Sequence, residues 1–236
     1  MRKENRIRVS CVSLISSPLI MKGDFFMSTQ KTNIKQRIRF ITVTGILGAV
    51  STVLMMLSFS IPFMPSFIKF DFSELPALIA AFSMGPVSGV AVCLIKNLIN
   101  LTMTTTGGVG ELSNFILGAS FVLPAGLIYK YHKTRKTALL SALLGSFVMG
   151  VISLPNNYFL TYPIYSKFMP IETIVGMYQK IFPAVADVFP GMDPLFSCLL
   201  IFNVPYTFFK GLVITMITFL IYKHISPIIK GNKTKK

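Results

Sequence analysis

A lysine and two asparagines lie within one of the longest apolar stretches of the sequence. Lys96 and Asn97 follow the residues VCLI, and a helix places Asn100 on the same face as Lys96. An ammonium group and two amides can bind a polar ligand, and inside a membrane they are too costly to lack a role. A lysine near the end of a spanning helix can extend to the surface. Lys96 lies about 15 Å along its helix, which favours a functional role.

An acidic residue and an amide begin the next apolar run. Glu111 and Asn114 are three residues apart and therefore share one face of a helix. Glu111 has two equally good interpretations: it pairs with Lys96, or it complements the positive end of the helix dipole. The two interpretations are compatible with each other.

Three polar residues form a stripe along the last apolar run. Thr207 and Lys210 follow Asn203 by four and seven residues. A charged stripe facing lipid is unfavourable, so we expect it to face the interior of a helix bundle. Asn157, at the end of another apolar run, is a further candidate, whereas the neighbouring Asn156 fits a capping or turn role equally well.

Two acidic residues of a preceding loop, Asp71 and Glu74, complete the set of candidates. The chain also has 21 Phe, 8 Tyr and no Trp. Most of these aromatic residues are accounted for by contact with lipid, but aromatic faces also stack on flat ligands, whose edges amides can bind. We therefore predict one pocket for a flat, mostly neutral ligand. The candidate ligand-binding residues are Asp71, Glu74, Lys96, Asn97, Asn100, Glu111, Asn114, Asn157, Asn203, Thr207 and Lys210.

The composition is that of an integral membrane protein. Of 236 residues, 53% are hydrophobic and 13% are charged, against about 25% charged in an average soluble domain. A soluble domain of this size cannot bury so much apolar surface. The net charge of +15 does not indicate a nucleic-acid partner, because the basic residues cluster between apolar runs as in cytoplasmic loops. The basic clusters lie at residues 2–8, 31–39, 130–136 and 223–236.

The pattern predicts an all-α bundle of six transmembrane helices with both termini in the cytoplasm. A spanning helix needs about 20 apolar residues. The second helix is too short to span straight, and we expect it to be tilted or partial and buried by its neighbours. Positive charge falls on one side at every crossing. The predicted helices are residues 38–61, 75–84, 86–103, 111–131, 137–160 and 195–222, with a short interfacial helix at 171–181.

Three regions follow from this pattern. We expect residues 1–37 to form a cytoplasmic segment without fixed structure, residues 38–223 the membrane domain, and residues 224–236 a basic cytoplasmic tail. Met27 begins an ordinary cytoplasmic start, MSTQKTNIKQR, so our hypothesis is that the residues before Met27 are either untranslated or disordered.

Several classes of active site are excluded by missing motifs. The sequence has no GxxxxGK[ST] phosphate-binding loop, no HExxH and no GxSxG. Three scattered cysteines, and two histidines beside basic clusters, favour neither a disulfide framework nor a metal site. We expect a chain that is not an enzyme, holds no metal or cofactor, and takes energy for uphill transport from another protein.

Small residues mark one face of the first helix. Gly45 and Ala49 form a pair of the type that allows helices to approach closely. The spacing alone favours packing within the bundle over docking of another membrane protein.

Several stretches of the chain resemble, in the same order, the riboflavin-specific S components of energy-coupling factor (ECF) transporters. The first is FDFSELPALIAAFSMGPVSGVAVCLIKNLIN, and it is followed by VGELSNFILGASF, LPNNYF and PYTFFKG. The resemblance covers residues 38–222, and it is specific because the pieces occur jointly.

The resemblance implies a six-helix fold in a prokaryotic plasma membrane, with riboflavin bound near the outer face under the first outer loop. It leaves open whether FMN also binds. It implies that Asn157 and Lys210 contact the flavin. Thr207 stands where the family commonly has asparagine, and Asn203 lies one turn earlier as a substitute.

The resemblance also implies partners. The family docks on a transmembrane coupling protein that works with two ATPases, and a small-residue motif on the first helix makes the contact. Gly45 and Ala49 are the nearest match in this chain. The resemblance therefore favours docking of the coupling protein over packing within the bundle as the role of these two residues.

The sequence also allows three alternative functions. An S component for another vitamin, such as thiamine, would share the fold and differ in the pocket. A stand-alone secondary transporter could use Lys96 and Glu111 as a proton relay. A membrane-embedded enzyme could use them as acid and base, although the missing motifs weigh against it.

Overall fold

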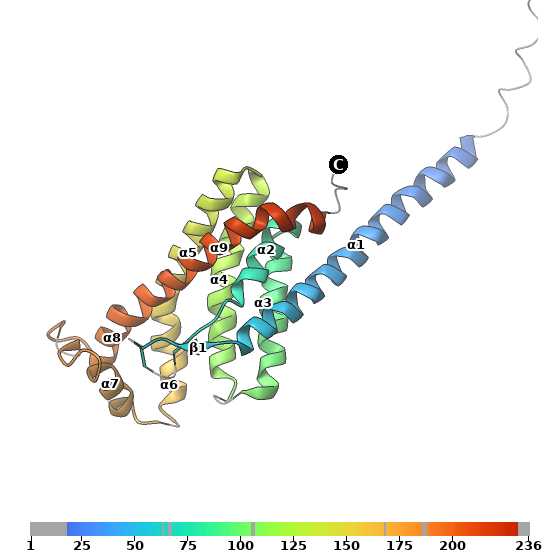
Figure 1. Cartoon of the computed structure of the whole chain (residues 1–236). Coiled ribbons are helices and arrows are strands. Elements are labelled where there is room, and N and C mark those ends of the chain that lie inside the picture. The colour runs from blue at the N-terminus through green and yellow to red at the C-terminus, as the bar shows by residue number, and fades with distance from the viewer. Residues whose placement is uncertain are drawn as a thin grey trace, which may run out of the picture. The chain divides into compact units, whose positions relative to one another are not determined.

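The computed structural model describes residues 18–62, 64–65, 68–104, 107–167, 169–185 and 188–230. At residues 18–33, 35–36 and 222–230 it describes the backbone alone. It consists of two compact units, Met1–Ile41 and Thr42–Lys236. The second unit holds the candidate site and is almost entirely helical (Figure 1).

The elements follow one another along the chain with short connections. They are α1 (Pro18–Met56), β1 (Phe59–Ser60), β2 (Lys69–Phe70), α2 (Glu74–Met84), α3 (Pro86–Asn100), the 3₁₀ turn η1 (Leu101–Met103), α4 (Val109–Tyr131), α5 (Arg135–Pro155), the π-helical η2 (Asn156–Thr161), α6 (Tyr162–Tyr165), α7 (Ile171–Gln179), α8 (Pro194–Cys198), the π-helical η4 (Leu199–Asn203) and α9 (Val204–Lys230).

Helical stretches long and apolar enough to cross a membrane number five in the described part of the chain. They are Arg37–Met56, Pro86–Met103, Val109–Tyr131, Arg135–Tyr165 and Pro194–Ile221. The remaining predicted helix, α2, has 11 residues and is about 17 Å long, shorter than the roughly 30 Å of a hydrocarbon core. It is the short, buried helix that the sequence predicts.

The turn between α2 and α3 forms where the sequence places it. Gly85 has φ +110°, a conformation that favours glycine, and its N–H donates to the carbonyl of Ala81. Pro86 then begins α3, where the missing N–H of proline costs nothing.

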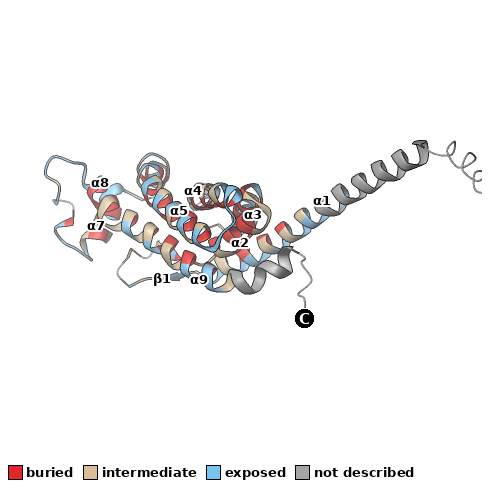
Figure 2. Ribbon diagram, turned by 90° about the horizontal axis from the view of Figure 1, so that it is seen from above, coloured by how far each residue is buried: buried red, intermediate tan, exposed pale blue. Residues whose placement is uncertain are grey.

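The core of the second unit surrounds α2. Most α2 residues are buried, including Ala77, Leu78 and Ala80 at 0% exposure, and α2 packs against α3, α4 and α9. Figure 2 shows buried residues of α2 and α3 meeting in the interior, while exposed residues lie on the outer faces of α5 and α9. Because α2 is covered on all sides, the loop before it is held deep in the bundle.

The structure differs from the sequence-based boundaries in several places. The helix α1 begins at Pro18 and ends at Met56 rather than at residue 61. The following loop forms a short antiparallel pair, in which Phe59 lies opposite Phe70. The fifth predicted helix continues through η2 into α6. The short helix α7 lies where residues 171–181 predict it.

Candidate functional site

Two adjoining cavities lie in the second unit, and we call them the apolar cavity and the polar cavity. The apolar cavity has a volume of about 200 Å³ and the polar cavity about 770 Å³. Pockets for small organic ligands range from about 300 to 1,000 Å³. The apolar cavity and the polar cavity share the lining residues Gly110, Ser113, Leu117, Tyr165, Tyr206 and Thr207. The shared wall makes them parts of one composite site.

The apolar cavity combines hydrophobic walls with two amides. Ile68 and Ile174 are among its apolar lining residues, and Asn157 and Asn203 supply the amides. The helix α7 contributes to this wall, so the segment that the sequence places at the membrane interface is part of the site.

Both amides come from π-helical turns. Asn157 lies in η2, which follows Pro155, and Asn203 lies in η4, which is followed by Pro205. Proline lacks an N–H and therefore cannot donate to the carbonyl four residues earlier. Such wide turns occur frequently at functional sites. The dipeptides Pro155–Asn156 and Val204–Pro205 are the sequence signal that could have marked them.

A hydrogen-bonded group of two tyrosines fixes the amide of Asn203. The hydroxyl of Tyr178 donates to Asn203 Oδ1 at 2.7 Å and lies 2.7 Å from the hydroxyl of Tyr162. Asn203 Nδ2 donates to the hydroxyl of Tyr162 at 3.4 Å. All three side chains are buried. Tyr178 therefore decides which way the amide of Asn203 is oriented.

Removing the Tyr178 hydroxyl should disturb this amide without opening the core. In Tyr178→Phe, Asn203 Oδ1 loses its donor, while the ring keeps its contact with Phe202. We expect the affinity for the ligand to fall by about tenfold, because the amide of Asn203 is no longer held in one orientation and binding must restore it at about the cost of one hydrogen bond, roughly 1–1.5 kcal/mol. Binding titration of the purified protein measures this. Tyr158→Phe is the matched control, because the Tyr158 hydroxyl bonds to Asp193 in an exposed position, and it should bind as the wild type does.

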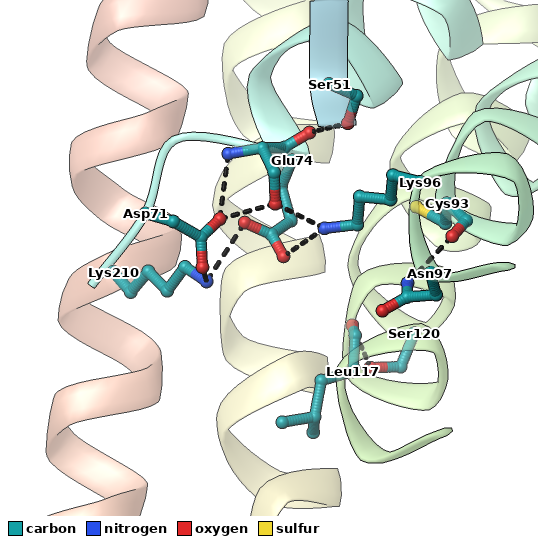
Figure 3. Close-up of polar contacts among 10 residues, drawn as sticks. Ser51, Asp71, Glu74, Cys93, Lys96, Asn97, Leu117, Ser120 and Lys210 are labelled. Carbon is teal, nitrogen blue, oxygen red and sulfur yellow. Dashed lines mark hydrogen bonds and ion pairs between the residues drawn. The ribbon is translucent and has the colours of Figure 1, made fainter. Parts of the chain in front are cut away.

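Two carboxylates and two lysines, Asp71, Glu74, Lys96 and Lys210, form what we call the charge cluster, and all of them except Lys96 line the polar cavity. Lys210 Nζ lies 3.0 Å from Asp71 Oδ2 and 3.1 Å from Glu74 Oε2. Lys96 Nζ lies 2.8 Å from Glu74 Oε1. Figure 3 shows the two lysines reaching the carboxylates from different helices, α3 and α9. The cluster is electrically balanced, which is the condition for burying four charges.

Ser73 links the loop to two helices of the bundle, α1 and α3. Its hydroxyl accepts from Lys96 Nζ and donates to Asp71 Oδ1. Its N–H donates to the same carboxylate oxygen at 2.9 Å, and its carbonyl accepts from Ser51 of α1. These bonds hold the loop from Asp71 to Ser73 in a single conformation.

The carboxyl of Asp71, which lies in the loop before α2, stays ionised. Burial acts to raise its pKa, but the charges of Lys210 and Lys96 and the hydrogen bonds from Ser73 outweigh burial and lower the pKa below its usual range. Lys210 therefore faces a negative charge.

Glu111 is bonded to neighbours on its own side of the polar cavity. It accepts from Asn100 at 3.0 Å and from Thr104 at 2.8 Å. The sequence allowed an ion pair between Lys96 and Glu111 as one of two interpretations of Glu111. This interpretation is wrong, because Lys96 pairs with Glu74. Spacing along helices α3 and α4 could not reveal this, because Glu74 belongs to a third element.

The structure brings most of the predicted site residues to the cavities. Lys96 and Asn97 are the exceptions, because neither belongs to the wall that a ligand would touch. Lys96 is fully buried, and Asn97 donates to the carbonyl of Cys93 at 2.7 Å. The predicted residues that line the cavities are Asp71, Glu74, Asn100, Glu111, Asn114, Asn157, Asn203, Thr207 and Lys210.

Sequence reasoning missed the residues that act between the predicted ones. Tyr162, Tyr178 and Ser73 orient site residues, and Tyr206 forms part of the shared wall. Their side chains are common in loops and aromatic belts, so residue type carried no signal. Only the pairing of distant segments reveals their roles.

The arrangement is suited to binding a flat ligand. In the part of the chain that the structure describes, no three His, Cys, Asp or Glu side chains are grouped as a metal site. Aromatic walls, amides and an ammonium held by carboxylates can enclose a flat ligand and satisfy its edges.

Comparison with known proteins gives one consistent family. The family model described as "ECF transporter, substrate-specific component" matches residues 39–222. The riboflavin transporter RibU of Staphylococcus aureus (strain TCH60) is 32% identical over 201 residues, which cover 85% of this chain and 97% of that protein. The riboflavin transporter FmnP of Bacillus subtilis (strain 168) is 31% identical over 201 residues, 84% of this chain and 97% of that protein.

A solved structure agrees with these relatives. It is described as "Structure and mechanism of the S component of a bacterial ECF transporter", and it has a TM-score of 0.63 and 30% sequence identity. The match covers 82% of this chain and 99% of that structure.

Proposed function

Because the chain belongs to the family of substrate-specific components of ECF transporters, we propose that it captures riboflavin in the composite site and delivers it across the membrane. The observation that carries the proposal is the joining of an apolar cavity that contains two amides to a polar cavity that contains Lys210. The relatives from Staphylococcus aureus and Bacillus subtilis are both named riboflavin transporters.

The chemical groups of riboflavin match the two cavities, one apolar and one polar. Its ring system is flat and aromatic, with carbonyl and imide groups along one edge, and its side chain carries several hydroxyls. Asn157, Asn203 and Lys210 provide donors for the ring edge. The family resemblance implies this role for Asn157 and Lys210. The polar groups of Asn100, Glu111 and Asn114 provide partners for hydroxyls.

The proposal includes a multi-pass topology in a prokaryotic plasma membrane. The five apolar stretches and the short α2 together supply six membrane-embedded helices. The exposed cluster from Lys130 to Lys136 between α4 and α5 favours a cytoplasmic position for that turn, and with it both termini. The site then lies toward the outer side, since η2, α6 and α7 lie at the opposite end from this turn (Figure 1).

Uphill transport then requires partners that hydrolyse ATP. We assign the docking of a transmembrane coupling protein, which works with two ATPases, to the exposed face of α1. Gly45 and Ala49 are exposed there, and a Cβ at Gly45 would meet nothing within 4 Å. Gly48 instead faces the bundle, where a Cβ would lie 2.8 Å from Ile95. Because Gly45 and Ala49 are exposed and Gly48 faces the bundle, docking of a partner is favoured over internal packing for Gly45 and Ala49.

A bulky residue on this face should separate binding from transport. In Gly45→Leu, we expect riboflavin affinity to remain within about twofold of wild type, because the side chain enters open space. We expect ATP-dependent uptake to fall by about tenfold or more, since close approach of helices needs small residues. Uptake of labelled riboflavin in cells that hold the full transporter measures this. The matched control is Ile46→Leu, an exposed apolar residue on α1. Normal uptake by Gly45→Leu would remove Gly45 from the interface.

Titration with riboflavin tests the ligand assignment. Riboflavin fluorescence should be quenched on binding to the purified protein in detergent, with a sharp one-to-one end point. Thiamine in excess should leave the signal unchanged, and FMN as competitor shows whether a phosphate is tolerated. Displacement by thiamine, or absence of quenching, would favour an S component for another vitamin.

A further inference from the structure

Lys96 is charged and fully buried, and it lies outside the walls of both cavities. We propose that Lys96 is a positioning residue, which holds the ammonium of Lys210 at the wall of the polar cavity by balancing Glu74 and orienting Asp71. The inference rests on the proposed function, because riboflavin binding is its readout.

The first route from Lys96 to Lys210 passes through Glu74. One carboxylate oxygen of Glu74 contacts Lys96 at 2.8 Å, and the other contacts Lys210 at 3.1 Å. Glu74 is 1% exposed, so its charge is compensated mainly by these two ammonium groups. With Lys96 present, Glu74 is shared between two ammonium groups and holds Lys210 only in part.

The second route passes through Ser73 and Asp71. Lys96 donates to the hydroxyl of Ser73, which donates to Asp71 Oδ1, and Asp71 Oδ2 accepts from Lys210 at 3.0 Å. The chain of bonds fixes the orientation of the Asp71 carboxylate, and therefore the place where Lys210 is held. Figure 3 shows the carboxylate of Glu74 between Lys96 and Lys210, with Asp71 beside Lys210.

The charges that surround Glu74 give Lys96 its importance. The helix α9 brings Lys210 and the hydroxyl of Tyr206 to this region, and α3 brings Lys96 and the thiol of Cys93. The helix α4 approaches Glu74 with Gly118, where a Cβ would lie 3.9 Å from Glu74 Cγ. Loss of Lys96 would leave Asp71 and Glu74 to share Lys210, and their excess negative charge would draw the ammonium away from a ligand.

A charge-balance experiment separates this role from simple packing. Lys96→Met leaves one surplus negative charge, and Glu74→Gln leaves one surplus positive charge. The double variant Lys96→Met/Glu74→Gln keeps Asp71 and Lys210 as a balanced pair. We expect each single change to weaken riboflavin binding by about tenfold, and the double variant to bind at least about threefold more tightly than either single variant.

Additive loss would overturn the inference. If Lys96 acts only through packing, the double variant should bind no better than the weaker single variant. Wild-type affinity in Lys96→Met would overturn it as well. If Lys96→Met does not fold, Glu74→Gln and the double variant still decide, because the double variant has no unbalanced charge. Elution volume and melting temperature establish which variants are folded.

The controls keep the two proposals apart. Lys130→Met removes an exposed lysine at the end of α4 and should bind riboflavin as the wild type does. A folded wild-type protein that does not bind riboflavin would contradict the proposed function itself. A wild-type protein that binds, together with variants that show no charge rescue, would contradict only the role of Lys96.

Discussion

Replacing Lys210 by methionine is expected to weaken riboflavin binding by about 100-fold or more. The change removes the only lysine of the charge cluster that lines a cavity in the described structure. It also leaves the carboxylate of Asp71 without its ion pair. Truncation of one partner in a buried hydrogen-bonded charge pair costs about 2–5 kcal/mol. Fluorescence titration below the melting temperature of the variant measures the change in affinity.

The matched control is Lys180→Met, which removes an exposed lysine after α7. It should leave affinity unchanged, because Lys180 lines neither cavity. Equal affinities for wild type and a folded Lys210→Met protein would show that the ligand does not depend on this ammonium, and the site would have to be placed elsewhere.

Gly145→Ala is expected to lower the melting temperature of the protein, because it adds a methyl group where two helices touch. A Cβ at Gly145 of α5 would lie 2.4 Å from the carbonyl oxygen of Phe121 in α4. Backbone cannot yield as a flexible side chain can, so the two helices must move apart. Overpacking of this kind costs about 1–3 kcal/mol, and thermal unfolding followed by elution of intact protein measures it.

The control for Gly145→Ala is a glycine substitution that is not expected to lower the melting temperature. Gly176 lies in α7, and a Cβ there would meet nothing within 4 Å. Alanine is favoured over glycine in a helix by up to about 1 kcal/mol. Gly176→Ala should therefore be neutral or stabilising. A Gly145→Ala protein as stable as the wild type would mean that α4 and α5 do not approach as closely as the structure places them.

Local sequence patterns predicted the elements that depend on local physics. The Gly85–Pro86 step marked the turn between α2 and α3, because glycine accepts positive φ and proline suits a helix start. Apolar length marked the candidate spans. Spacing also placed Thr207 and Lys210 correctly on the inner face of α9, since both are buried.

Long-range pairing explains most of what the sequence did not predict. Lys96 is 22 residues from Glu74, and Lys210 is 139 residues from Asp71. Helical periodicity gives the face of each residue, but it does not give the depth at which two helices meet. For that reason the sequence offered Glu111 as one possible partner of Lys96, and it did not reveal the contact between Asp71 and Lys210.

The π-helical turns illustrate the same limit on a shorter scale. Asn157 and Asn203 were correctly predicted to lie at one site, and both line the apolar cavity. Their exact presentation depends on η2 and η4, where the backbone widens beside a proline. A regular α-helix through the same residues would rotate each later side chain to another face.

The visible absorption spectrum tests the central claim most directly. The protein would be purified in detergent from cells grown with riboflavin, without added ligand. We predict a yellow protein whose flavin bands correspond to about one riboflavin per chain. A folded, colourless protein that also fails to quench the fluorescence of added riboflavin would contradict the assignment of the composite site to riboflavin.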